Sequence, residues 1–126
     1  MNPLLALAFA LQLPGGGGPI DWDRLSPLPW REEPQVTPDL SRFVADEVKA
    51  KRCVPPKRTD NKAAIDVDVA VMIRADGAVR VTVPRAIDCP TVEQFAAGLV
   101  TSFARNNLRT AREGWYRASV SFTLAQ

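Results

Sequence analysis

Apolar residues occupy every second position from Ile65 to Val83, on both sides of a short polar interruption. This alternation is typical of strands with one buried face, and the polar interruption marks a turn, so the stretch predicts a β-hairpin. The side chains that we expect on the buried face are Ile65, Val67, Val69, Val71 and Ile73, followed by Val79, Val81 and Val83.

The parity of this alternation predicts the turn. Ile73 and Val79 face the same core only if Ala75, Asp76 and Gly77 form a three-residue loop. Gly77 then takes the left-handed position, which glycine occupies at little cost. Asp76 and Gly77 are therefore the predicted turn residues.

A helix is predicted to precede the hairpin. Thr37 suits the N-cap, Pro38 the first helical position and Asp39 the first turn. The predicted buried stripe is Leu40, Phe43, Val44 and Val48. The basic residues that follow it are typical of a solvated helix end.

A second helix is predicted after the hairpin, with Cys89 as N-cap and Pro90 at the first helical position. Its apolar stripe is Val92, Phe95, Ala96, Leu99 and Phe103. The prolines and polar residues of 53–62 predict a loop between the first helix and the hairpin.

Alternation returns between Trp115 and Leu124 and predicts a third strand. Its inward side chains are Tyr116, Ala118, Val120, Phe122 and Leu124. Its outward side chains are Trp115, Arg117, Ser119, Ser121 and Thr123.

These elements predict an α+β fold in the order α-β-β-α-β. A helical crossover favours parallel strands, which places the strand 65–74 in the centre of a three-stranded antiparallel or mixed sheet. Both helices should cover one face, as a two-layer sandwich, because the other face is polar and open. The residues expected on that open face are Asp66, Asp68, Arg80, Thr82, Arg117, Ser119 and Ser121.

The chain divides into three parts by composition. Residues 1–13 are apolar but too short to span a bilayer, and they suit a secretory signal, with a loosely docked terminal segment as the alternative. Residues 14–37 are a linker rich in proline and glycine, whose Trp22 and Trp30 either pack back on the domain or contact a partner. The domain itself is expected to cover 38–126.

Composition excludes several kinds of chemistry. The chain of 126 residues has a net charge of +2, which is too small to indicate a nucleic-acid partner. It contains no histidine, the commonest general base and zinc ligand. We therefore expect no catalytic residue, no metal site and no cofactor.

The order of elements and the hairpin resemble the C-terminal domains of the TonB and TolA cell-envelope proteins. The valines and isoleucine from Val67 to Ile73, the pair Asp76-Gly77 and the valines from Val79 to Val83 carry the resemblance, which extends over about residues 38–126. A proline-rich segment, 84–90, replaces the small-residue turn typical of that family. The resemblance implies a periplasmic or envelope domain that recruits partner segments to its sheet.

Cys53 and Cys89 are the only cysteines. Each lies at the end of a helix, and both helices cover the same sheet face, so a disulfide is predicted between them. The alternative is a reactive thiolate at Cys89, beside a helix N-terminus, in a small thiol redox protein or enzyme.

Asp66 and Asp68 are expected on the same face of one strand. Two carboxylates in this arrangement can serve in acid/base catalysis or bind a divalent cation. The favoured interpretation is a solvated polar face near Arg80 and Arg117.

The leading functional hypothesis is a non-catalytic binding module. The strand Trp115–Leu124 would have an unpaired edge that accepts an extended peptide by β-augmentation, and the predicted partner-binding residues are Trp115, Arg117, Ser119 and Ser121. The expected partner is an envelope protein or peptide, in the periplasm, without a membrane span. A cytoplasmic location and a nucleic-acid-binding domain are the remaining alternatives.

Overall fold

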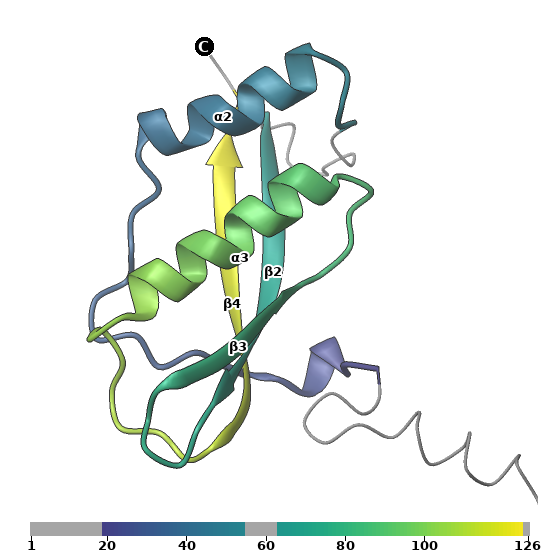
Figure 1. Cartoon of the computed structure of the whole chain (residues 1–126). Coiled ribbons are helices and arrows are strands. Elements are labelled where there is room, and N and C mark those ends of the chain that lie inside the picture. Colours follow the sequence, from purple (N-terminus) through teal and green to yellow (C-terminus); the bar gives the residue numbers. More distant parts are fainter. Residues whose placement is uncertain (1–18, 55–62, 125–126) are drawn as a thin grey trace, which may run out of the picture.

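The protein is an α+β sandwich built on a four-stranded mixed sheet. The computed structural model describes residues 19–54 and 63–124; the predicted apolar segment 1–13, the start of the linker and most of the predicted loop 53–62 lie outside these residues. Figure 1 shows the arrangement. Its elements are η1 (Trp22–Arg24), β1 (Ser26–Pro27), α2 (Pro38–Lys49), β2 (Ala64–Ile73), β3 (Val79–Pro84), α3 (Pro90–Ala104) and β4 (Gly114–Thr123).

Strand β2 is central, as predicted. The sheet order is β1-β4-β2-β3, and β2 pairs antiparallel with both β3 and β4. The alternate residues of β2 form the middle of the core and are all buried, namely Ile65, Val67, Val69, Val71 and Ile73.

The prediction of three strands is wrong, because the linker contributes a fourth. Ser26 and Pro27 form β1, which pairs parallel with Tyr116 and Arg117 at the start of β4. Two residues are too few to show alternation, and proline lacks the N–H that a longer strand would need. The neighbouring Leu28 is buried in the core.

The turn of the hairpin is confirmed. The N–H of Arg74 donates to the carbonyl oxygen of Ala78 at 2.8 Å, which encloses the three residues predicted for the loop. Gly77 has φ +88°, in the left-handed region. The Asp76 carboxylate accepts the N–H of Ala78 at 3.0 Å and fixes the turn.

The predicted orientation of β3 is wrong beyond its first residue. Val79 pairs with Ile73, but Val81 pairs with Met72, so Arg80 is an extra residue in a β-bulge. One extra residue turns every later side chain to the opposite face. Val81 and Val83 therefore leave the predicted core face.

Thr82 consequently lies on the helix side of the sheet and not on the polar face. Its hydroxyl is 3.1 Å from the hydroxyl of Thr101 and 3.5 Å from the carbonyl oxygen of Ala97, both on α3. The bulge thus replaces an apolar contact with a polar contact between β3 and α3.

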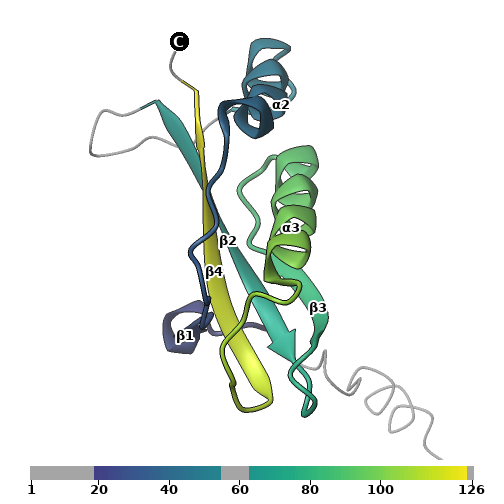
Figure 2. The same ribbon diagram turned by 90° about the vertical axis from the view of Figure 1, so that its left-hand side faces the viewer.

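Both helices cover one face of the sheet, as predicted, and Figure 2 shows them on the same side. Helix α2 begins with the expected cap, because the Thr37 hydroxyl accepts the N–H of Leu40 at 3.3 Å. Its buried stripe differs from the predicted one and consists of Ser41, Val44 and Glu47, whereas Phe43 is 39% exposed. Figure 1 shows the reason: α2 lies across one end of the sheet, where it meets little besides β4.

The opposite face is not fully open, because η1 lies against it (Figure 2). The guanidinium carbon of Arg85 is 5.3 Å from the centre of the Trp22 ring, which is a cation–π distance. Arg117 donates from Nη1 to the carbonyl oxygen of Trp22 at 3.3 Å. Trp30 packs against the core on the helix side, so both linker tryptophans pack on the domain.

Candidate functional site

The edge of β4 is free only in its middle. At one end the carbonyl oxygen of Arg117 accepts the N–H of Leu28 at 2.8 Å. At the other end the N–H of Thr123 donates to the Ser41 hydroxyl at 3.2 Å. The expectation of an edge open along its whole length is therefore wrong.

Alternate residues of a strand direct their backbone groups to the same side. Arg117 and Thr123 both direct theirs away from β2, so Ser119 and Ser121 between them do the same. In residues 19–54 and 63–124, no backbone hydrogen bond joins Ser119 or Ser121 on that side. The free edge thus offers two N–H and two C=O groups.

The side chains of the four predicted partner-binding residues lie together on the helix-free face. The Ser119 hydroxyl donates to Oδ1 of Asp68 at 2.6 Å, and the Ser121 hydroxyl donates to Oδ1 of Asp66 at 2.7 Å. Arg117 bonds the backbone of Trp22, and Trp115 is half-buried opposite Met72. The serine side chains therefore link β4 to β2, whereas the backbone groups of the same serines face the free edge.

The basic partner of Asp68 is not one of the arginines expected near it. Besides Ser119, Asp68 contacts Nη1 of Arg85 at 3.3 Å, and the hydroxyl of Ser121 bonds Asp66. The sequence predicts a solvated polar face near Arg80 and Arg117. Arg85 directly follows β3 and lies opposite Asp68, because its N–H donates to the carbonyl oxygen of Asp68 at 2.8 Å.

A groove of about 490 Å³ lies beside the free edge, between α2 and the end of β4. Its lining includes Val36, Ser41, Arg42, Ala45, Lys49 and Thr123. Sequence reasoning missed this groove, because its walls come from the linker, a helix and a strand that meet only in the folded chain. No motif in the sequence signals it.

The predicted disulfide between Cys53 and Cys89 is confirmed. Their Cα atoms are 5.0 Å apart, and the two residues are 3% and 0% exposed. The bond joins the end of α2 to the start of α3. It leaves the chain without a free thiol, because these are its only cysteines.

Glu47 is a buried carboxylate next to the disulfide-linked helix ends. Its Oε2 accepts from Nε of Arg52 at 3.0 Å, and its Oε1 accepts from the Thr91 hydroxyl at 2.7 Å. The Arg52 hydrogen bond, followed by the Thr91 hydrogen bond, lowers the pKa of Glu47 below its ordinary value. Glu47 therefore connects α2 to α3. The sequence around Glu47 gives no sign of this structural role, because charged residues lie close to it, as on an exposed helix face.

Comparison with known proteins returns no match. Neither a family model, nor a curated protein, nor a solved structure matches the chain. The resemblance to the TonB and TolA C-terminal domains therefore rests on the order of elements and the hairpin pattern alone.

The chemistry available at the β4 edge is hydrogen bonding by backbone groups. Among the described residues, no group of three or more metal-ligating side chains is present. No helix of that part of the chain is long and apolar enough to cross a membrane. The arrangement is suited to holding an extended chain.

Proposed function

We propose that the protein is a non-catalytic binding module that takes an extended peptide segment along the edge of β4. The observation that carries this proposal is the pair of unpaired backbone positions at Ser119 and Ser121. A peptide strand added there continues the sheet between β1 and α2. Main-chain hydrogen bonds supply affinity in this mode, and neighbouring pockets supply specificity.

The hydrogen bonds that the edge offers are too few to give tight peptide binding without the neighbouring groove. Two N–H and two C=O groups give at most four hydrogen bonds, each with a net value of about 0.5–1.5 kcal/mol. Their sum is comparable to the roughly 4 kcal/mol of a millimolar complex. Side chains of the peptide that enter the groove lined by Val36 and Ala45 must therefore supply the remaining affinity.

We place this module in the bacterial periplasm or cell envelope. The disulfide is consistent with an oxidising, exported compartment, because such bonds rarely persist in a reducing cytosol. The family resemblance implies the same location and the same binding mode.

The disulfide favours binding over thiol chemistry. Cys89 has no thiolate while the bond is intact, and both sulfur-bearing residues are almost fully buried. The carboxylates of Asp66 and Asp68 lie on the helix-free face, which makes that face a poor surface for nucleic-acid phosphates.

Amide shift mapping tests the proposal. The isotope-labelled full chain is titrated with peptides of alternating valine and serine, and with the same peptides carrying proline at every second position. We expect shifts centred on Ser119 to Ser121 with the first set only. Shifts confined to residues before Pro38, with β4 silent, would contradict the proposal.

A further inference from the structure

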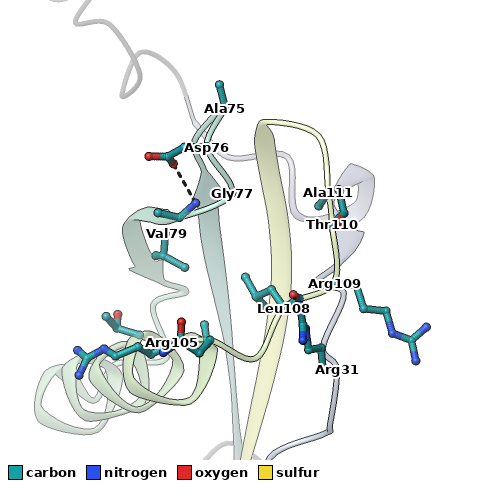
Figure 3. A pocket seen from close by; sticks show the side chains of 14 residues that line it. Arg31, Ala75, Asp76, Gly77, Val79, Arg105, Leu108, Arg109, Thr110 and Ala111 are labelled. Carbon is teal, nitrogen blue, oxygen red and sulfur yellow. Dashed lines mark hydrogen bonds between the residues drawn. The ribbon is translucent and has the colours of Figure 1, made fainter.

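A second groove, of about 750 Å³, lies at the other end of the sheet from α2 and its groove (Figure 3). One wall is the hairpin turn at Asp76 and Gly77, and the other is formed by the end of α3 and the following loop. The strand register separates the two grooves, because Ile73 pairs with Gly114 at this end of the sheet, whereas Ala64 pairs with Thr123 at the other end.

Three arginines line this groove: Arg31 comes from the segment before α2, and Arg105 and Arg109 come from the end of α3 and the loop after it. Arg31 is held in place, because its Nε donates to the carbonyl oxygen of Leu108 at 3.0 Å. Nothing in the described part of the chain forms an ion pair with any of these three guanidinium groups.

The acidic lining does not neutralise these charges. Among the described residues of the lining, Asp76 is the only one with a carboxylate. It forms an ion pair with Arg74 at 3.0 Å and accepts the N–H of Ala78. The described lining therefore has an excess of positive charge.

From this charge distribution we infer that the groove binds an extended acidic segment of a protein or peptide. Figure 3 shows the Arg105 and Arg109 side chains pointing away from each other at the rim of the groove, with Arg31 between them beside Leu108. Carboxylates spaced along an extended chain match this spread, whereas one compact anion such as phosphate would reach only one guanidinium group. The walls between the arginines include Val79 and Ala104, which suit the uncharged residues of such a segment.

The walls of the groove are already fixed. Asn107 donates from Nδ2 to the carbonyl oxygen of Glu32 and accepts the N–H of Glu32 at its Oδ1, at 2.9 and 3.0 Å. The N–H of Arg109 donates to the carbonyl oxygen of Pro29 at 2.8 Å. A ligand therefore orders only the arginine side chains, which lowers the entropic cost of binding.

Fluorescence anisotropy of a labelled peptide tests this inference. Two labelled peptides are compared for binding to the full chain. One alternates glutamate and serine, and the other alternates glutamine and serine. The test variant is Arg105→Gln with Arg109→Gln. The matched control is Arg24→Gln with Lys51→Gln, which removes the same charge from exposed positions away from the groove.

We expect the glutamate peptide to bind and the glutamine peptide not to bind. The groove variant should lose about tenfold in affinity and the control variant less than about twofold, since each exposed charge pair contributes modestly. Binding should weaken as salt screens the charges. Equal losses in the two variants, equal binding of the two peptides, or complete displacement by inorganic phosphate or a single-stranded oligonucleotide would overturn the inference.

A further variant separates this site from the β4 edge. Ser119→Pro blocks the proposed edge but leaves the groove unchanged, so it should bind the glutamate peptide like the unmodified chain. Loss of that binding in Ser119→Pro would show that the acidic peptide binds at the edge and would overturn the assignment to the groove.

Discussion

The N–H of Leu28 donates a 2.8 Å hydrogen bond to the carbonyl oxygen of Arg117. This bond fixes a residue of the predicted linker to the last strand of the domain. It also closes the first part of the edge on which a partner strand was expected. The segment before α2 therefore both completes the sheet and limits the place where a peptide can add.

Leu28 should contribute to the stability of the whole domain. Its side chain is 4% exposed and belongs to the main core. Leu28→Ala should lower the free energy of unfolding by about 2–5 kcal/mol, as for other buried leucines. Val54→Ala is the control, because Val54 is 77% exposed. Equal midpoints in chemical denaturation for the two variants would show that Leu28 is not part of the cooperative core.

The disulfide should stabilise the fold by restricting the unfolded chain. It closes a loop across 36 positions, which corresponds to about 3–4 kcal/mol on the chain-entropy model. We expect the double variant Cys53→Ala with Cys89→Ala to have a free energy of unfolding lower by this amount and therefore to unfold at a lower denaturant concentration. The variant should also become insensitive to reductant, whereas the unmodified chain should lose stability when it is reduced.

The two glycines Gly77 and Gly98 should respond in opposite directions to alanine. Gly77 has φ +88°, where a side chain is strained, so Gly77→Ala should destabilise by about 1–2 kcal/mol. Gly98 lies within α3, and an added Cβ there meets nothing within 4 Å, so Gly98→Ala should stabilise by about 0.5–1 kcal/mol. Thermal unfolding measures both, and a shift of the same sign in the two variants would contradict the assigned backbone geometry.

Glu47 should make the free energy of unfolding fall at low pH. Because hydrogen bonds from Arg52 and then Thr91 lower its pKa in the folded state, the stabilisation is present above the ordinary value of 4.5 and is lost as pH falls through the lowered pKa. Glu47→Gln should therefore lose less stability than the unmodified chain between pH 7 and pH 3. The exposed Glu113→Gln serves as control and should keep the full acid dependence.

Much of the fold follows from periodicity in the sequence. The alternation from Ile65 to Ile73 predicts the central strand, and the parity between Ile73 and Val79 predicts the three-residue turn. The cysteine positions at two helix ends predict the disulfide. These features depend on local spacing, which a single sequence displays directly.

The features that were not predicted depend on contacts between distant segments. Strand β1 is two residues long and contains Pro27, so no local pattern reveals it. The bulge at Arg80 leaves the valine alternation visible in the sequence while it turns Val81 and Val83 away from the helices. The contact between Ser41 and Thr123 shortens the free edge through tertiary packing alone.

If the backbone at Ser119 and Ser121 receives a partner strand, Ser119→Pro should weaken peptide binding and Ser119→Ala should not, so the peptide affinities of these two variants are the most direct test. Both variants lose the hydroxyl bond to Asp68, but only proline removes the N–H that faces the edge, and proline is tolerated on such an edge. We predict that the valine–serine peptide binds Ser119→Ala within about twofold of the unmodified chain and binds Ser119→Pro at least about tenfold more weakly. Equal affinity for the two folded variants would contradict the claim.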